Sequence, residues 1–105
     1  MMSVSVNKDN FFTEVTKADG LVIVDFYLDG CVPCKRLSPI LYEIEKEFKD
    51  KLKIAKINTG FNKELVDEYE VLSAPTLLFF KNGEEKERLH GALNKAQIIR
   101  VINQY

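Results

Sequence analysis

Two cysteines separated by two residues form the most reactive side-chain pair in this sequence. Cys31 and Cys34 are its only cysteines, and Val32 and Pro33 lie between them. Thiols at this spacing exchange between a dithiol and a disulfide, and a metal site is the main alternative. A structural zinc needs four ligands, and the single histidine, His90, is the only other soft ligand. The motif therefore favours redox chemistry over metal binding.

The motif lies at a predicted junction between a strand and a helix. Residues 21–28 are apolar at nearly every position, which is typical of a strand covered on both faces. After the cysteines, four apolar residues recur at helical spacing, namely Leu37, Leu41, Ile44 and Phe48. A cysteine at a helix N-terminus has its thiolate stabilised by the helix dipole and by unpaired amides. We therefore expect Cys31 to be the nucleophile and Cys34, one turn further in, to be the resolving thiol. This context argues against a pair of inert core cysteines.

The rest of the chain alternates between strand and helix patterns. Val4 and Val6 predict a short first strand, and a helix is expected over residues 11–17, capped by Asn10, with Phe12 and Val15 facing inward. Further strands are predicted over residues 52–57, 76–81 and 85–90, with a tight turn at Asn82-Gly83. Two more helices are expected after Asn62 and Asn94, the latter with a capping box to Gln97. The order βαβαβαββα predicts an α/β fold with a central mixed five-stranded sheet flanked by four helices.

Length and charge restrict the function classes. At 105 residues the chain is expected to form a single domain over residues 1–105. A net charge of −1 provides no broad field for nucleic acid or an anionic membrane, so neither is an expected partner. The sequence has no apolar run near the ~20 residues that a membrane helix needs, and its start lacks a secretory pattern. We therefore expect a cytoplasmic protein, where a lone cysteine pair is more often catalytic than structural.

Five short motifs together resemble the thioredoxin family in order and spacing: Asp25-Phe26-Tyr27, Cys31-Val32-Pro33-Cys34-Lys35, Ala74-Pro75-Thr76, Lys81-Asn82-Gly83 and Gly91-Ala92. The resemblance extends from about Val4 to Gln104. It implies the thioredoxin fold and protein-disulfide reduction, with electrons carried by the two sulfurs and no bound cofactor or metal. The implied partners are disulfide-containing proteins and a thioredoxin reductase or similar electron donor. We expect the protein to be a monomer.

The resemblance also implies supporting residues around the cysteines. Asp25 matches the buried acid that helps to deprotonate Cys34 through water, and burial in an apolar strand should raise its pKa. Lys56 matches a family lysine near that acid, although a lysine that merely extends from a strand to solvent is an equal alternative. Pro75 resembles the family's cis-proline, which faces the thiols.

The contact surface for partners is the third implication of the resemblance. It comprises Gly30, Val32, Pro33, Thr59, Ala74, Pro75, His90, Gly91 and Ala92. An extended substrate segment would pair with the backbone of Ala74 by strand addition. The chain departs from the family in having no tryptophan: Gly30 and Tyr27 stand where tryptophans are usual, and Val32 replaces a glycine. We therefore hypothesise that the disulfide chemistry is retained and the set of partners is shifted.

Two other hypotheses share this fold. A disulfide oxidase or isomerase would often carry a histidine between its cysteines and work outside the cytosol, and this sequence indicates neither. A non-catalytic binding module would be favoured by loss of one cysteine, and both are present. His90 is more simply an exposed residue than a catalytic one, although it could tune a bound partner near neutral pH.

Overall fold

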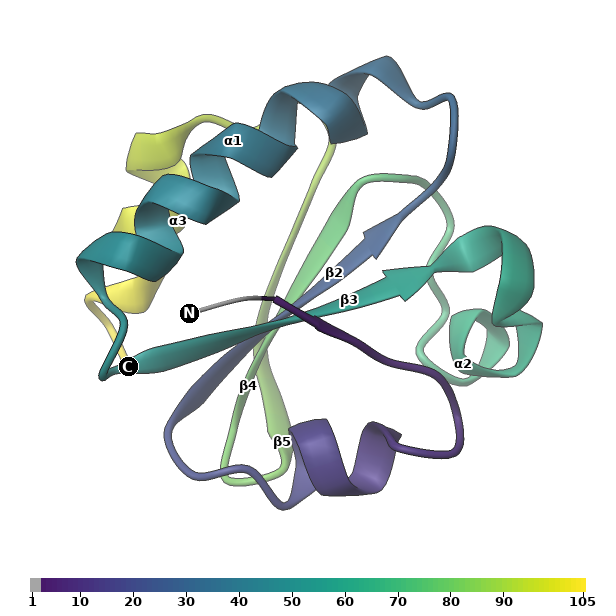
Figure 1. Ribbon diagram of the computed structural model, residues 1–105, viewed down its shortest axis with the longest axis horizontal. Helices are drawn as coiled ribbons and strands as arrows, with labels where there is room; N and C mark the ends of the chain where they lie inside the picture. Colours follow the sequence, from purple (N-terminus) through teal and green to yellow (C-terminus); the bar gives the residue numbers. More distant parts are fainter. Residues whose placement is uncertain (1–2) are drawn as a thin grey trace.

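The computed structural model describes residues 3–105, and its strands form one mixed sheet (Figure 1). The spatial order is β1-β3-β2-β4-β5. Strands β1, β3 and β2 are parallel, whereas β4 is antiparallel to both β2 and β5. The strands are β1 (Val4–Ser5), β2 (Leu21–Tyr27), β3 (Leu52–Asn58), β4 (Thr76–Lys81) and β5 (Glu84–His90). This arrangement confirms the predicted mixed five-stranded sheet.

Helices cover both faces of the sheet, with α1 and α3 on one face and η1 and α2 on the other (Figure 1). The α-helices are α1 (Val32–Glu47), α2 (Lys63–Glu68) and α3 (Lys95–Ile102). A π-helical segment, η1 (Phe12–Thr16), is the fourth, and a 3₁₀ turn, η2 (Thr59–Phe61), precedes α2. Alternate residues of β2 enter different cores: Ile23 packs on the α1 side and Val24 on the η1 side.

The first helix differs from its prediction. Phe12 is 62% exposed, and Phe11 is buried instead, together with the expected Val15. The amide of Lys17 donates to the carbonyl of Phe12, five residues back, so the turn is wider than that of an α-helix. Asn10 does not cap this segment, because its side-chain Oδ1 accepts from the backbone N–H of Asn7 and its Nδ2 donates to the Ser5 carbonyl. The prediction was therefore right about a helix and wrong about its inward face.

The other helix starts and the hairpin are partly as predicted. Asn94 and Gln97 form the expected capping box at the start of α3. Asn62 precedes α2, but its side chain donates to the Asn58 carbonyl and does not cap the helix. Asn82, with φ 54°, lies in the tight turn between β4 and β5, as the sequence indicates.

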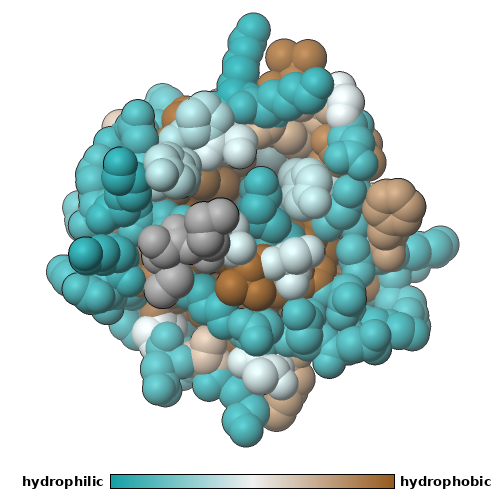
Figure 2. Space-filling model, in the orientation of Figure 1, coloured by the Kyte–Doolittle hydropathy of each residue, from teal (hydrophilic) through white to brown (hydrophobic). Residues whose placement is uncertain are grey.

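Hydrophilic side chains cover most of the face seen in Figure 2. Hydrophobic ones come to the surface at its upper right, over the region where β2 leads into α1 and β3 leads into α2 in Figure 1. Among residues 3–105, no helix combines the length and apolar character that a bilayer crossing requires.

Candidate redox site

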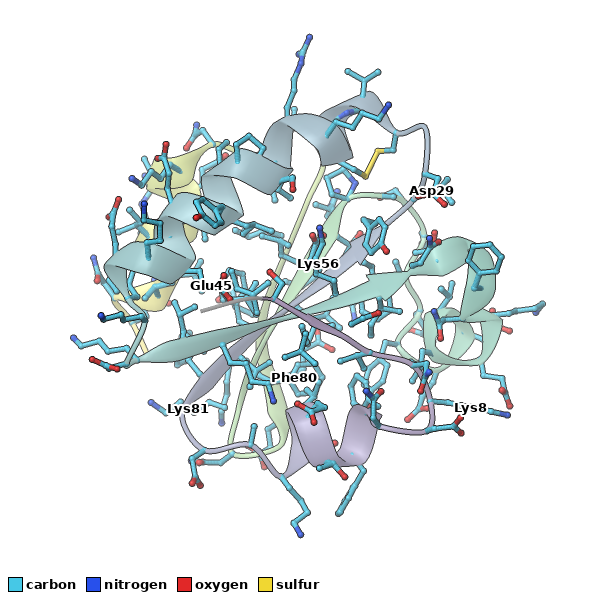
Figure 3. All side chains as sticks on the ribbon, viewed as in Figure 1. Lys8, Asp29, Glu45, Lys56, Phe80 and Lys81 are labelled. Atoms are coloured by element: carbon cyan, nitrogen blue, oxygen red, sulfur yellow. A yellow bond between two sulfur atoms is a disulfide. The ribbon has the colours of Figure 1, made fainter. Side chains whose placement is uncertain are left out.

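Cys31 and Cys34 form a disulfide at the start of α1, close to the loop that carries Asp29 (Figure 3). Cys31 is the N-cap residue, in extended conformation, and the backbone N–H of Cys34 donates to its Sγ at 3.2 Å. An amide that points at this sulfur stabilises negative charge on it, in addition to the helix dipole. Cys31 is half-buried, whereas Cys34 is only 8% exposed. The two sulfurs thus differ in access, as the sequence predicts.

A tight turn connects the end of β2 to Cys31. The N–H of Cys31 donates to the carbonyl of Leu28 at 3.3 Å, which closes a four-residue turn. Gly30, the third residue of this turn, has φ +79°, and a Cβ built there meets nothing within 4 Å. Glycine at this position is therefore explained by backbone conformation and not by lack of space.

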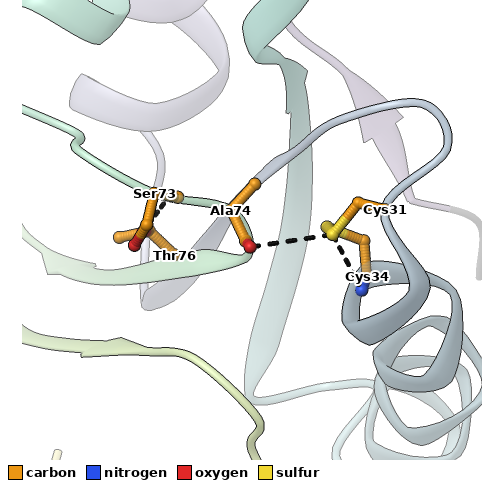
Figure 4. The surroundings of a disulfide bond; sticks show 5 residues. All are labelled: Cys31, Cys34, Ser73, Ala74 and Thr76. Atoms are coloured by element: carbon orange, nitrogen blue, oxygen red, sulfur yellow. Dashed lines mark hydrogen bonds between the residues drawn. A yellow bond between two sulfur atoms is a disulfide. The ribbon is translucent and has the colours of Figure 1, made fainter.

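A second loop faces the disulfide and contains Pro75, whose bond to Ala74 is cis. The Ala74 carbonyl oxygen lies 3.6 Å from Cys31 Sγ (Figure 4). Two hydrogen bonds hold the loop: the Thr76 hydroxyl donates to the Ser73 carbonyl at 2.6 Å, and the Gly91 N–H donates to the Pro75 carbonyl at 3.2 Å. The loop before β4 and the end of β5 are thereby fixed beside the reactive sulfur.

Asp25 and Lys56 lie side by side on neighbouring strands, in the register of β2 with β3. By alternation both side chains lie on the sheet face covered by α1. Asp25 is buried, and its Oδ1 has no hydrogen-bond partner within residues 3–105. Desolvation raises the pKa of Asp25 from 3.8 to about 6, and the positive charge of Lys56 opposes part of that rise. Lys56 Nζ also lies 4.8 Å from the centroid of the Tyr27 ring.

An open cleft of about 200 Å³ lies beside Cys34. Its lining includes Cys34, Ser38, Lys56 and Tyr27. The cleft is large enough for several water molecules, since one water occupies about 30 Å³ in the liquid. Cys34 and Lys56 both line this cleft, and Lys56 is the strand neighbour of Asp25.

The predicted contact residues lie in the first turn of α1, on the loop before β4, at and after the end of β5, and at the start of η2. Val32 and Pro33 are exposed in the first turn of α1, and Ala74 and Pro75 lie on the facing loop. His90 is exposed at the end of β5, opposite Thr76, and is followed by Gly91 and the exposed Ala92. Thr59 begins η2 and lines a groove with Ala74. Their role in binding remains a prediction.

Two apolar residues near the disulfide were missed by sequence reasoning. Leu72 is 95% exposed and Leu28 is 44% exposed, and both line the groove that contains Thr59 and Ala74. The sequence predicts Leu28 as the last residue of a buried strand, but β2 ends at Tyr27 and Leu28 lies exposed in the turn that follows. A signal existed only for Leu72, a leucine within a short loop segment where polar residues are usual.

A cysteine pair at a helix N-terminus, facing a cis-proline loop on a mixed sheet, defines the class of thiol–disulfide oxidoreductases. The family model described as Thioredoxin matches residues 2–104. The chain belongs to the thioredoxin family, and it acts by dithiol/disulfide exchange at Cys31 and Cys34.

Similar proteins from different organisms agree with this assignment. A thioredoxin of Rickettsia bellii is 40% identical over 102 residues, which cover 97% of each chain. A thioredoxin of Rickettsia typhi is 43% identical over 99 residues and 94% of each chain. The chloroplastic M-type thioredoxin of Chlamydomonas reinhardtii is 39% identical over 101 residues, covering 96% of this chain and 72% of that protein. The likeness therefore spans nearly the whole sequence.

Proposed function

We propose that this protein reduces disulfides in other proteins, with Cys31 as the nucleophile and Cys34 as the resolving thiol. The Cys31 thiolate attacks one sulfur of the target disulfide, forms a mixed disulfide and releases the other target sulfur as a thiolate. The Cys34 thiolate then attacks Cys31 Sγ and releases the second target sulfur. The target gains two electrons, and the protein is left with its internal disulfide.

One observation carries this division of roles: the N–H of Cys34 donates to Cys31 Sγ, and Cys31 is the more accessible sulfur. The hydrogen bond lowers the energy of a Cys31 thiolate, which favours attack by Cys31 at neutral pH. Cys34 is buried one turn inside the helix, with the two Cα atoms 5.2 Å apart. It is therefore shielded from foreign proteins but within reach of Cys31.

Asp25 is the proposed base for the resolving step. A carboxylate with a pKa of about 6 is ionised at neutral pH and is more basic than an ordinary aspartate. It would accept the Cys34 proton through water in the cleft beside Cys34. Lys56, as the neighbouring cation, would moderate the pKa of Asp25.

The proposed substrates are disulfide-containing proteins that dock on the contact surface of Gly30, Val32, Pro33, Thr59, Ala74, Pro75, His90, Gly91 and Ala92. A thioredoxin reductase or similar donor would return the protein to its dithiol form. We propose action as a single-domain monomer in the cytoplasm, because a disulfide reductant needs a compartment that supplies electrons. The small residue at Gly30 supports a partner set that differs from that of tryptophan-bearing relatives.

Reduction of insulin disulfides with a chemical reductant tests the activity. We expect the Cys31→Ser variant to be inactive, and the Cys34→Ser variant to accumulate mixed disulfides through Cys31. The Ser38→Ala variant, altered at the same cleft but without a thiol role, is the matched control and should keep its activity. Mixed disulfides that form through Cys34 in the Cys31→Ser variant, with none through Cys31 in Cys34→Ser, would reverse the assignment.

A further inference from the structure

Tyr27 is the last residue of β2 and lies beside the proposed base, Asp25. It is half-buried on the sheet face covered by α1, because it follows Asp25 by two residues in the same strand. Tyr27 also lines the cleft that contains Cys34 and Lys56. The tyrosine, the acid and the lysine therefore share one face of the sheet, under the helix that carries the resolving thiol.

The Lys56 ammonium lies over the Tyr27 ring and not on the neighbouring carboxylate. Its Nζ is 4.8 Å from the ring centroid, within the ~6 Å range of a cation–π contact. Asp25 is the direct neighbour of Lys56 in the register of β2 with β3, yet the two form no ion pair, and Asp25 Oδ1 has no hydrogen-bond partner in the described part of the chain. The lysine thus has two potential partners on this face, and it contacts the ring.

The other charged groups of the cleft do not explain this position of the ammonium. Asp29 lines the cleft, but its Oδ2 accepts a hydrogen bond from Asn58 Nδ2 at 3.2 Å. From α1 the cleft receives Lys35, whose charge repels a second ammonium, and Cys34, which is uncharged in the disulfide. The aromatic face of Tyr27 is the attractive contact that remains.

The place of the ammonium matters for Asp25 because few other charges act on this buried group. Its neighbour in β4 is Leu77, which is fully buried and uncharged. Desolvation raises the pKa of Asp25 to about 6, and the positive charge of Lys56 opposes that rise. Attraction between charges grows as their distance falls, so an ammonium paired with Asp25 would lower its pKa further and make it a weaker base.

We propose that Tyr27 is a positioning residue, whose ring holds the Lys56 ammonium by a cation–π contact and keeps it from pairing with Asp25. This inference rests on the proposed function, in which Asp25 is the base of the resolving step. At a partly exposed site such a contact favours the ring-bound position by about two- to fivefold. It uses the face of the ring and not the hydroxyl, so phenylalanine should replace tyrosine here and leucine should not.

Carbon NMR titration of the Asp25 carboxyl group in the disulfide form tests the contact. Tyr27→Phe keeps the ring, so the pKa of Asp25 should stay near its value of about 6. Tyr27→Leu frees the ammonium to approach the carboxylate, so the pKa of Asp25 should fall toward 3.8. Release of the target from the mixed disulfide at pH 7 should then slow several-fold in Tyr27→Leu, because a weaker base accepts the Cys34 proton less readily, and Tyr27→Phe should restore it.

Tyr42→Leu is the matched control, because Tyr42 makes a similar contact with Lys46 but is exposed on α1 outside the cleft. It should leave the pKa of Asp25 unchanged. An Asp25 pKa that is equal in Tyr27→Leu and the wild type would overturn the proposal. In a Lys56→Met background, Tyr27→Leu should no longer lower that pKa. A fall of the same size without the lysine would mean that the ring only excludes water, and it too would overturn the proposal.

A measurement on the wild type alone does not depend on the folding of any variant. The ring current of Tyr27 should shift the Lys56 Cε protons upfield, and ordinary lysine shifts would overturn the contact. Failure of the wild type to reduce insulin would instead overturn the proposed function. The titration is made on the disulfide form and does not require that activity, so the two failures are distinguishable.

Discussion

Asp25 and Glu45 are two buried carboxylates in different positions relative to the thiols. Their side chains are 3% and 2% exposed, and each has an oxygen without a hydrogen-bond partner in the part of the chain that the structure describes. Desolvation raises the pKa of both groups. Burial alone therefore makes each carboxylate a stronger base than it is in water.

Position separates the two acids. Asp25 lies beside Lys56 on the sheet face covered by α1, the helix that carries Cys34. Glu45 belongs to α1 itself, eleven residues after Cys34, which is about 16 Å along a helix axis. If Asp25 is the base, as we propose, its position and not its raised pKa distinguishes it from Glu45. Variants at the two positions test this distinction.

The raised pKa that the two acids share should appear in the pH dependence of the free energy of unfolding. The native state holds the Asp25 proton up to pH about 6, whereas the unfolded chain loses it near 3.8, so stability falls as pH rises through that interval. At about 1.4 kcal/mol per pKa unit, the ionised form costs about 3 kcal/mol. Asp25→Asn keeps the shape of the side chain and removes its charge. The free energy of unfolding of this variant, relative to that of the wild type, should therefore increase by about 3 kcal/mol from pH 3.5 to pH 8.

Urea unfolding of the disulfide form at the two pH values measures this gain. Glu45→Gln should gain stability in the same direction, because the pKa of Glu45 is raised by the same cause. A difference between Asp25→Asn and wild type that stays constant with pH would contradict a raised pKa at Asp25.

The rate of disulfide exchange should depend on Asp25 and not on Glu45. Asp25→Asn should slow release of the target from the mixed disulfide at pH 7 by about 10- to 100-fold. This loss is at or below the rate enhancement that a general base usually provides. The deficit should shrink as pH approaches the ordinary thiol pKa of about 8.5, because Cys34 then ionises unaided. Glu45→Gln should match the wild type at every pH. A deficit that is uniform across pH would assign Asp25 a structural role only.

Much of the fold and site could be predicted because local patterns and tertiary packing agree there. The apolar run of β2, the stripe of α1 and the Asn94–Gln97 capping box each specify one structure. The order of the cysteines' access follows from their places at the start of α1. Here, the helix N-terminus that makes Cys31 reactive is itself visible in the sequence.

The remaining features depend on contacts that sequence patterns do not contain. Phe11 and Phe12 are identical in propensity, and only the wide turn of η1 decides which is buried. The groove beside Ala74 forms where Leu28, just after β2, meets residues 59–74, which are distant from it in the chain. Gly30 was noted as a missing tryptophan, yet its φ of +79° means that Gly30→Trp would add backbone strain to any change in partner contact.

Lys56 distinguishes the two acids most directly, since it is the cation that lowers the pKa of Asp25. Lys56→Met keeps the apolar stem beside Tyr27 and removes the charge, so the pKa of Asp25 should rise further. Carbon NMR titration of the Asp25 carboxyl group measures the change. Lys53→Met is the matched control on the same strand, because Lys53 pairs with Glu14 of η1 at 2.6 Å, toward the opposite sheet face. An unchanged Asp25 pKa in Lys56→Met would mean that Lys56 only extends to solvent. Burial alone would then set the pKa of Asp25.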